Sequence, residues 1–235
     1  MKKIKEFLLD HIPIYGWAAI FVIVSLNLIV YYGTTIITDS LRHYDIASTL
    51  DKKIPFVPSF IIVYIVVAYA QWWFGYYTAA REDKKTVLYV FGAESIAKIL
   101  CMIIFFVFPT TMERGEIIGT DLFSRLVTVL YKSDSPCNLF PSIHCLESYL
   151  LWRTLPQLKK APHWYKCLTP FVTVMVFASV LLVKQHAIAD ILGAILVTEI
   201  GVHVMAGLLK IDKQPYLNAI LFIFRKSNHR KKIIE

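Results

Sequence analysis

The chain has 235 residues and a formal net charge of +8, and 57% of its side chains are hydrophobic. Soluble domains usually contain about 45–50% apolar residues, so this composition argues against a soluble protein. The basic residues cluster between apolar runs and at both ends, and no RNA- or DNA-binding motif is visible. Nucleic acid is therefore not an expected partner.

Long uncharged runs predict the secondary structure, because several reach the ~18 apolar residues that suggest a membrane-spanning helix. We therefore expect an all-α polytopic membrane protein, a six-transmembrane-helix bundle that forms a single integral membrane domain over residues 1–235. The predicted helices cover residues 12–38, 54–80, 86–108, 142–156, 165–183 and 186–209, and a basic tail covers 210–235. In that tail the apolar residues 215–224 are too short to span and suit an interfacial helix.

Lysine and arginine residues predict the orientation. They concentrate at the N-terminus, in the links after the second and fourth helices, and at the C-terminus. Cytoplasmic segments carry the excess of these residues, so both termini should be cytoplasmic. The starts of the fourth and sixth helices should then face away from the cytoplasm. We expect a multi-pass protein of the cell membrane with its active site on the extracytoplasmic face.

The four cysteines are Cys101, Cys137, Cys145 and Cys167, and no two of them form a CxxC pair. Neither a zinc site nor a dithiol redox site is therefore indicated. Cys137 and Cys145 should lie near one membrane face, which leaves a disulfide between them open.

The segment 138–144, Asn-Leu-Phe-Pro-Ser-Ile-His, starts the fourth predicted helix. Pro141 followed by Ser142 is typical of a helix N-cap. The free amide groups of such a helix end attract a phosphate, and His144 would sit in the first turn beside it. The alternative is an ordinary capped helix with an interfacial histidine.

A second histidine lies at the start of the sixth predicted helix. His186 and Asp190 are four residues apart and share one helical face. The carboxylate can hold the proton on one imidazole nitrogen and leave the other free to attack, as in a serine protease triad. A structural ion pair is the alternative. Because the fourth and sixth helices run in the same direction, Ser142, His144 and His186 should reach the same depth.

These two segments resemble the second and third signature motifs of the type 2 phosphatidic acid phosphatase superfamily, which comprises six-helix membrane enzymes related to vanadium haloperoxidases. The residues concerned are 138–144 and Lys-Gln-His-Ala-Ile-Ala-Asp at 184–190, and the likeness covers roughly residues 105–200. The superfamily includes lipid phosphate phosphatases and head-group phosphotransferases of the sphingomyelin-synthase kind.

The resemblance implies a role for each matching residue. His186 would be the nucleophile that forms a phosphohistidine, and Asp190 would orient it. His144 would protonate the leaving oxygen, and Ser142 would hold the phosphate. Arg114 is a plausible counterpart of the arginine in the first motif.

The chain departs from the family pattern at three positions. Gly115 stands where the first motif has proline, Val107 where it has lysine, and Val180 where the third motif has arginine. Cations offset the charge of a phosphoryl transition state, so we hypothesise that Lys184 replaces the missing arginine. Lys132 is a weaker alternative.

The remaining polar residues of the predicted helices have less certain roles. Glu94 and Lys98 are four residues apart, in the order that favours a mutual ion pair, although charges inside a membrane are often functional. Glu147, three residues after His144, could orient that imidazole, and Asn138 is a further candidate supporting residue. We interpret Glu199 and His203 as structural.

We expect a metal-independent lipid phosphatase that needs no cofactor and hydrolyses a lipid phosphate ester through a phosphohistidine. Transfer of the phosphoryl group to an alcohol, as in sphingomyelin or inositol-phosphoryl transfer, shares that intermediate and stays open. A lipid transporter or flippase and a non-catalytic membrane scaffold are the alternatives of another class. The expected partners are a lipid phosphate and membrane lipids, and the oligomeric state is open.

Overall fold

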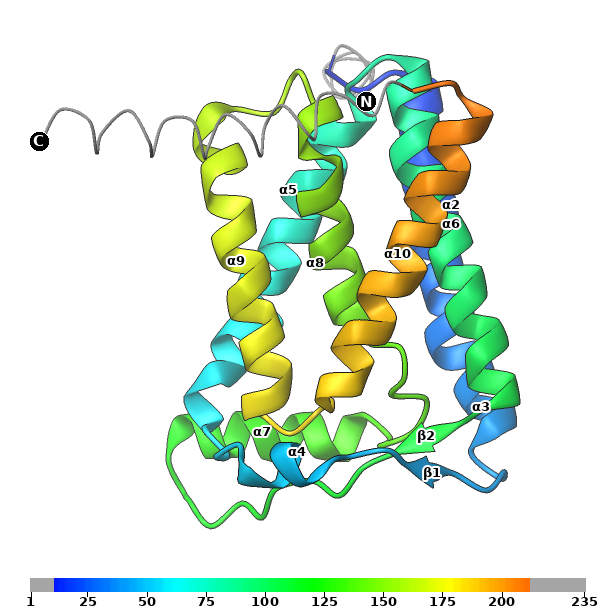
Figure 1. The fold of residues 1–235 in the computed structure, drawn as a ribbon. Helices are drawn as coiled ribbons and strands as arrows, with labels where there is room; N and C mark the ends of the chain where they lie inside the picture. The colour runs from blue at the N-terminus through cyan, green and yellow to red at the C-terminus, as the bar shows by residue number, and fades with distance from the viewer. Residues whose placement is uncertain (1–10, 212–235) are drawn as a thin grey trace, which may run out of the picture.

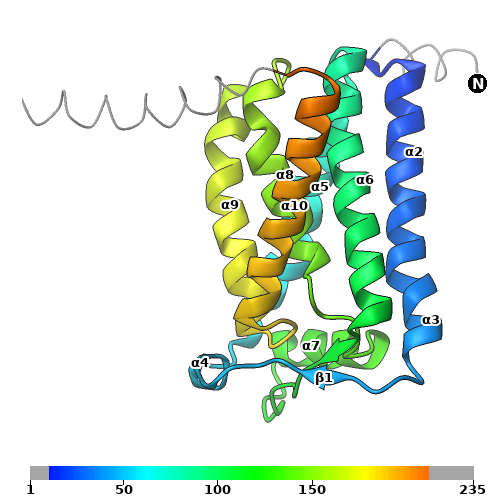
Figure 2. The same ribbon diagram turned by 45° about the vertical axis from the view of Figure 1, so that its right-hand side comes forward.

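A computed structural model describes residues 11–211 of the chain, and it shows an upright bundle of helices (Figures 1 and 2). The first helix runs as α2 (Ile14–Leu28), a π-helical segment (Ile29–Gly33) and α3 (Thr34–Thr38). The second runs as a 3-10 turn (Pro58–Phe60), a π-helical segment (Val63–Val67) and α5 (Ala68–Ala80). The remaining long elements are α6 (Lys84–Val107), α8 (Ile143–Thr154), α9 (His163–Leu182) and α10 (Ile188–Leu208).

Local chemistry explains several of these boundaries. Asp83 caps α6 by accepting hydrogen bonds from the amides of Lys85 and Thr86, which satisfies groups that a helix start leaves unpaired. The helix ends before Pro109, since proline disfavours helical geometry in the residue preceding it. All six predicted helices are found within a few residues of their expected bounds.

Five helices within residues 11–211 are long and apolar enough to cross a membrane. They are Ile14–Thr38, Pro58–Ala80, Lys84–Val107, His163–Leu182 and Ile188–Leu208. The expected fourth span, α8, has only 12 residues and falls short of the ~20 that a bilayer requires. The start of α2 and the end of α10 lie at the same end of the bundle (Figure 1). The predicted interfacial helix at 215–224 lies outside the described residues.

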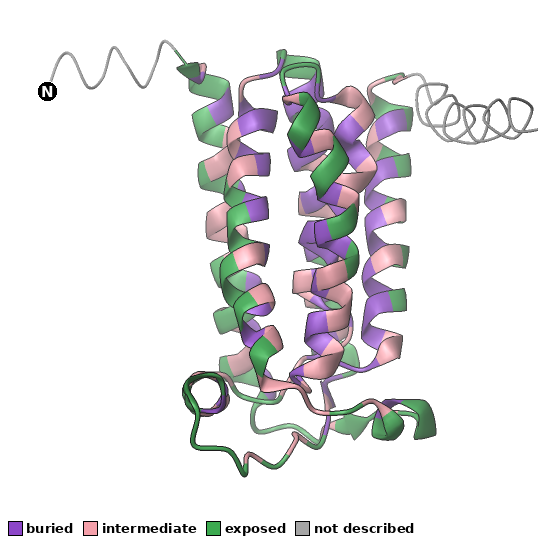
Figure 3. Cartoon of the chain, turned by 90° about the vertical axis from the view of Figure 1, so that its left-hand side faces the viewer, coloured by how far each residue is buried: buried purple, intermediate pink, exposed green. Residues whose placement is uncertain are grey.

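The outer faces of the bundle are apolar, which is the arrangement that a lipid environment favours. Figure 3 shows exposed faces along the full length of the helices, and Phe21, Phe171 and Leu192 on them are 74%, 63% and 62% exposed. In a soluble bundle these positions would carry polar side chains. The protein is therefore a multi-pass, all-α membrane protein.

A layer of short elements closes one end of the bundle (Figure 1). It contains β1 (Tyr44–Asp45), which pairs in parallel with β2 (Thr110–Thr111), together with α4 (Thr49–Lys53) and α7 (Leu122–Ser133). Helix α7 was not predicted, because its residues lie between the third and fourth predicted helices, in a segment rich in charged residues. Asp121 caps α7 through the amides of Phe123 and Ser124, an N-cap signal that was present in the sequence.

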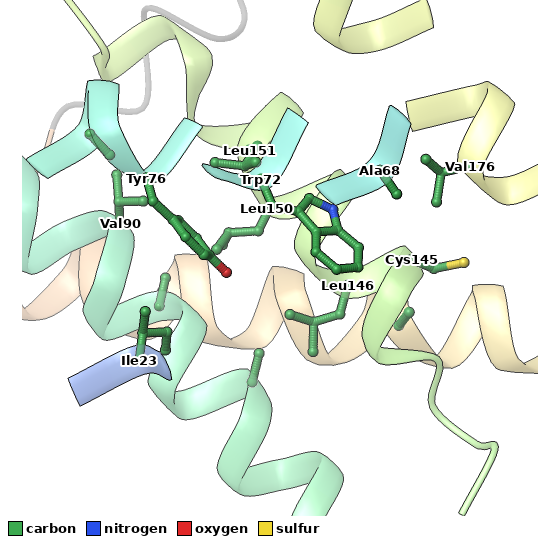
Figure 4. Packing of buried hydrophobic residues seen from close by; sticks show 14 of the residues in the cluster. Ile23, Ala68, Trp72, Tyr76, Val90, Cys145, Leu146, Leu150, Leu151 and Val176 are labelled. Atoms are coloured by element: carbon green, nitrogen blue, oxygen red, sulfur yellow. The ribbon is translucent and has the colours of Figure 1, made fainter. Parts of the chain in front are cut away.

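Close helix packing positions the elements that carry the histidines. Trp72 and Tyr76 of α5 pack toward Leu146 and Leu150 of α8 in the buried core (Figure 4). Helix α10 approaches α6 so closely that a Cβ placed on Gly201 would lie 2.2 Å from the carbonyl oxygen of Ala93. Such small-residue contacts are typical of helix pairs in membranes.

Candidate active site

The two histidines of the sequence motifs lie together where the bundle meets the layer of short elements. His144 occupies the first turn of α8, and His186 lies in the turn between α9 and α10. A backbone hydrogen bond from the amide of Ser142 to the carbonyl of Asp190, 3.1 Å, joins the two helix starts. The imidazole centroids are 6.4 Å apart. Hydrogen bonds of about 2.8 Å from each ring can meet on one phosphate placed between them.

Asp190 holds His186 in one orientation. Its Oδ2 lies 3.1 Å from Nδ1 of the imidazole and also accepts a hydrogen bond of 2.9 Å from the amide of Ala187. Both side chains are buried, at 8% and 1% exposed. A carboxylate at Nδ1 favours the proton on that nitrogen and leaves the lone pair on Nε2. The predicted pairing of these two residues is confirmed.

Aromatic side chains enclose His144. Its ring stacks on that of Tyr64 with centroids 4.2 Å apart, and the indole of Trp72 lies 5.1 Å away. Trp72 is fixed in turn by a 2.8 Å hydrogen bond from its Nε1 to the hydroxyl of Ser148. Nε2 of His144 is buried and has no hydrogen-bond partner within residues 11–211. Since buried polar atoms are normally paired, this nitrogen is available to a ligand.

Ser142 and Asn138 shape the segment before α8. The hydroxyl oxygen of Ser142 accepts a 3.3 Å hydrogen bond from the amide of Cys145 and so caps the start of α8, as predicted. Asn138 has a positive φ of 56°, and its side-chain amide donates to the hydroxyls of Thr38 and Thr34, at 2.6 and 3.3 Å. Asn138 therefore supports the loop and does not contact either imidazole.

Arg114 reaches the site through Gln185, a residue to which the sequence analysis assigned no role. The guanidinium donates to the carbonyls of Tyr131 and Asp134, at 2.9 and 2.7 Å. Its Nη2 donates to Oδ2 of Asp134, at 3.2 Å, and to Oε1 of Gln185, at 3.3 Å. The Nε2 of Gln185 is buried and without a partner in the described part of the chain. Gln185 precedes His186 directly, so its amide is a candidate phosphate donor.

The ammonium of Lys184 is bound by two backbone carbonyls, which does not support the hypothesis that it replaces the missing arginine. It donates to the carbonyls of Asp51 and Ile54, at 2.8 and 2.6 Å. The amide of Ile188 donates to Oδ1 of Asp51 at 2.7 Å. This hydrogen bond links α4 to the start of α10. A φ of 53° at Lys184 turns the chain there. Lys132, the weaker candidate, is exposed on α7.

The contacts between Lys184 and α4 determine the pKa shifts of Lys184 and Asp51. Burial lowers the pKa of Lys184 against the opposing attraction of Asp51. Partial burial alone would raise the pKa of Asp51, but hydrogen bonds from the hydroxyl of Ser48 and the amide of Ile188 outweigh it and hold that pKa below its ordinary value. Asp51 therefore remains charged at neutral pH.

Glu147 does not orient His144. Its carboxylate pairs with Lys98, at 2.8 Å, and lies 2.7 Å from the hydroxyl of Tyr76. The predicted pair of Glu94 with Lys98 is confirmed, at 2.9 Å. Glu199 pairs with Arg153 and His203, at 2.7 and 3.3 Å. All four cysteines are free, so the disulfide that the sequence left open is not formed.

A cavity of about 400 Å³ extends from His144 into the bundle. The side chains that line it come from α2, α5, α6, α7, α8 and both π-helical segments, and most are aromatic or aliphatic. Leu28, Tyr69 and Trp73 of its wall are also exposed on the outer, lipid-facing surface. The cavity therefore lies between His144 and the apolar surroundings of the bundle.

No family model, curated protein or solved structure matches the chain. Within residues 11–211 no group of three or more His, Cys, Asp or Glu side chains is arranged to hold a metal ion. The functional argument therefore depends on the geometry of the site and on the motifs of the sequence.

Proposed function

We propose that this protein is a membrane-embedded lipid phosphatase that works through a phosphohistidine. One observation supports this most strongly: an imidazole oriented by a buried carboxylate lies 6.4 Å from a second imidazole whose Nε2 has no partner in the described chain. Structural histidines have no need of this arrangement. A nucleophile oriented by an acid, with a general acid opposite, does need it.

The reaction would proceed in two displacements. Nε2 of His186 attacks phosphorus and forms the P–N bond while the P–O bond to the lipid breaks, and His144 gives its proton to the departing oxygen. His144, now neutral, takes a proton from water, whose oxygen attacks the phosphohistidine and releases phosphate. Asp190 stabilises the positive imidazole ring throughout. Ser142, Gln185 and Arg114 would offset the charge that develops on the phosphoryl oxygens.

The cavity supports a lipid as the substrate. Its aromatic and aliphatic lining suits a hydrocarbon chain, and the nearby polar groups suit a phosphate. A soluble phosphate ester would leave this apolar lining in contact with water, at a cost that rises with its area.

The proposed topology has six crossings and places both termini in the cytoplasm. Five crossings are the long apolar helices, and the remaining one is the short helix α8, which its neighbours shield from lipid. The lysine and arginine pattern supports this orientation. The site would then face away from the cytoplasm in the cell membrane. The orientation can be tested with single cysteines placed at exposed Lys132 and at exposed Lys159. The measurement is their accessibility to a thiol reagent that does not cross the membrane. Labelling of Lys132→Cys from outside the cell and of Lys159→Cys only after lysis is expected, and the reverse pattern would refute the orientation.

The decisive experiment measures phosphate release by the purified protein in detergent. Candidate substrates are phosphatidate, phosphatidylglycerophosphate, isoprenyl diphosphate and sphingoid phosphates. His186→Ala should abolish release and also abolish labelling of the protein by a radioactive phosphoryl group. His203→Ala is the matched control, because His203 is an exposed histidine on α10, the helix that follows His186, and it should retain activity. Full activity of His186→Ala would refute the mechanism.

Head-group transfer is the second candidate, since both reactions share the covalent intermediate. Adding diacylglycerol or ceramide to the assay separates the two. A labelled product lipid would indicate transfer, whereas free phosphate alone indicates hydrolysis. If neither product forms with any lipid of the panel, a transporter or a scaffold becomes the better interpretation.

A further inference from the structure

Four titratable side chains meet inside the bundle, one turn from His144. Lys98 of α6 lies 2.9 Å from Oε1 of Glu94 and 2.8 Å from Oε1 of Glu147. The hydroxyl of Tyr76 lies 2.5 Å from Oε1 of Glu94 and 2.7 Å from Oε2 of Glu147. All four side chains are buried, at 5% exposed or less. We refer to Tyr76, Glu94, Lys98 and Glu147 as the buried cluster.

The hydrogen bonds of this cluster require one more proton than ionised carboxylates provide. Tyr76 touches two carboxyl groups, yet its hydroxyl has only one proton to donate. If it donates to Glu94, the contact with Glu147 is a repulsion between oxygens unless Glu147 carries a proton. A proton on Oε2 of Glu147 resolves the conflict: Glu147 donates to Tyr76, and Tyr76 donates to Glu94.

A proton on Oε1 of Glu94 resolves the conflict in the same way: Glu94 then donates to Tyr76, and Tyr76 donates to Glu147. Oε2 of Glu94 has no partner within residues 11–211, so a proton there would leave the conflict at Tyr76 unresolved. The geometry therefore requires one proton on the two carboxyl oxygens that face Tyr76.

Charge balance leads to the same conclusion. Lys98 contributes +1, and two ionised carboxylates would contribute −2, so the cluster would carry −1 in an apolar interior. An uncompensated buried charge costs several kcal/mol or more. One bound proton makes the cluster neutral.

The cluster adjoins the candidate active site. Glu147 follows His144 by three residues on α8 and so lies on the same side of that helix. Tyr76, Lys98, His144 and Glu147 all line the single cavity described above. Other charges near His144 are paired elsewhere: Asp190 with His186, Asp134 with Arg114, and Glu199 with Arg153. The rings of Tyr64 and Tyr69 also face the His144 ring.

We propose that the buried cluster binds one exchangeable proton, held between the carboxyl groups of Glu94 and Glu147, and that gain or loss of this proton sets the proton affinity of His144. This inference rests on the proposed function, in which His144 is the general acid. Glu147, Tyr76, Lys98 and Glu94 are positioning residues, because they would act through His144. When the cluster loses its proton to the solvent, it gains a net negative charge that favours the protonated form of His144.

Two substitutions should shift the pH dependence in the same direction. Glu147→Gln leaves Lys98 and Glu94 as a neutral pair, and Glu94→Gln leaves Lys98 and Glu147 as a neutral pair. Neither pair has a proton on a carboxyl group to lose, so the alkaline limb of kcat should move to lower pH in both variants. Each shift should be on the order of one pH unit, a tenfold change in proton affinity. Glu199→Gln, which alters a carboxyl group of α10 that pairs with Arg153, is the control and should cause no shift.

The proton itself can be observed without an activity assay. Infrared spectroscopy of the full-length protein in detergent at neutral pH should show the band of a protonated carboxylic acid, and Glu147→Gln should remove that band. The wild-type measurement stays informative even if a variant fails to fold. If the wild type lacks the band, the bound proton is refuted.

If the band is present but the pH profiles of Glu147→Gln and Glu94→Gln match the wild type, the coupling to His144 is refuted. If the wild type hydrolyses no lipid phosphate, the proposed function fails, and the infrared result still decides whether the cluster holds a proton.

Discussion

The contact between α10 and α6 provides a test of the structure that does not depend on any activity. Gly201 faces the backbone of Ala93, and a methyl group at Gly201 would lie 2.2 Å from its carbonyl oxygen and 3.1 Å from its carbonyl carbon. Backbone atoms cannot swing aside as a flexible side chain can. Gly201→Ala must therefore push the two helices apart.

The size of the effect follows from these distances. A carbon and a carbonyl oxygen in close contact lie about 3.3 Å apart, so the helices must separate by roughly 1 Å. Overpacking of this kind lowers the free energy of unfolding by about 1–3 kcal/mol. The higher helix propensity of alanine offsets up to ~1 kcal/mol of this loss. A net loss of about 1–2 kcal/mol corresponds to a fall in Tm of roughly 2–8 °C for a protein of this size.

Thermal unfolding of the purified protein in detergent measures this loss. Gly207→Ala is the matched control, because Gly207 lies on the same helix and a Cβ there would meet nothing within 4 Å. That variant should keep or raise Tm by helix propensity alone. Equal Tm values for the two alanine variants would refute the packing of α10 against α6. Because α10 begins beside His186, Gly201→Ala should also reduce turnover, by as much as about 100-fold for a 1 Å displacement.

Further predictions concern the candidate active site and the contact between Asp51 and α10. Asp190→Asn keeps the shape of the carboxyl group but loses its charge. A charged hydrogen bond is stronger than a neutral one by ~1 kcal/mol or more, so kcat should fall at least about tenfold. A kcat equal to that of the wild type would contradict the orienting role. Gln185→Leu removes the unpaired donor and should raise KM for the lipid phosphate with little change in Tm; an unchanged kcat/KM would show that this amide is not used. Asp51 has a lowered pKa in the folded protein, so its contribution to stability is present above about pH 4 and is lost as the pH falls through the folded-state value. Asp51→Asn should therefore lower Tm at pH 7 and have less effect at pH 3, and an equal effect at both pH values would contradict this assignment. Activity should persist in EDTA, and loss of activity that added metal restores would overturn the expectation of metal independence.

Much of the fold was predictable because a bilayer requires long apolar helices. The six predicted helices lie within a few residues of those observed, and the ionic order of Glu94 and Lys98 correctly predicted their pairing. Helix α7 was missed because it is amphipathic and lies in a segment rich in charged residues, so it has no long apolar run. The capping residue Asp121, followed by Phe123 and Ser124, marked its start.

One prediction for single site residues succeeded because the two residues are close in the chain. His186 and Asp190 pair as expected, although His186 lies in the turn just before α10 and Asp190 lies in its first turn. Lys184 was misplaced because it lies in a turn, where a positive φ points its side chain at α4. Glu147 was assigned to the wrong partner because Tyr76 and Lys98, from two other helices, compete for its carboxylate.

The sequence by itself determined that this is a helical membrane protein with two histidine motifs at the starts of two helices, since hydropathy and helical period act locally along the chain. Only the tertiary structure decided that the two imidazoles lie 6.4 Å apart, that Arg114 contacts Gln185 beside His186, and that Glu147 belongs to the buried cluster. Those relations depend on which faces of α5, α6, α8 and α10 pack together. Packing is set by shape and by buried charge across segments far apart in the chain, and no local pattern records it.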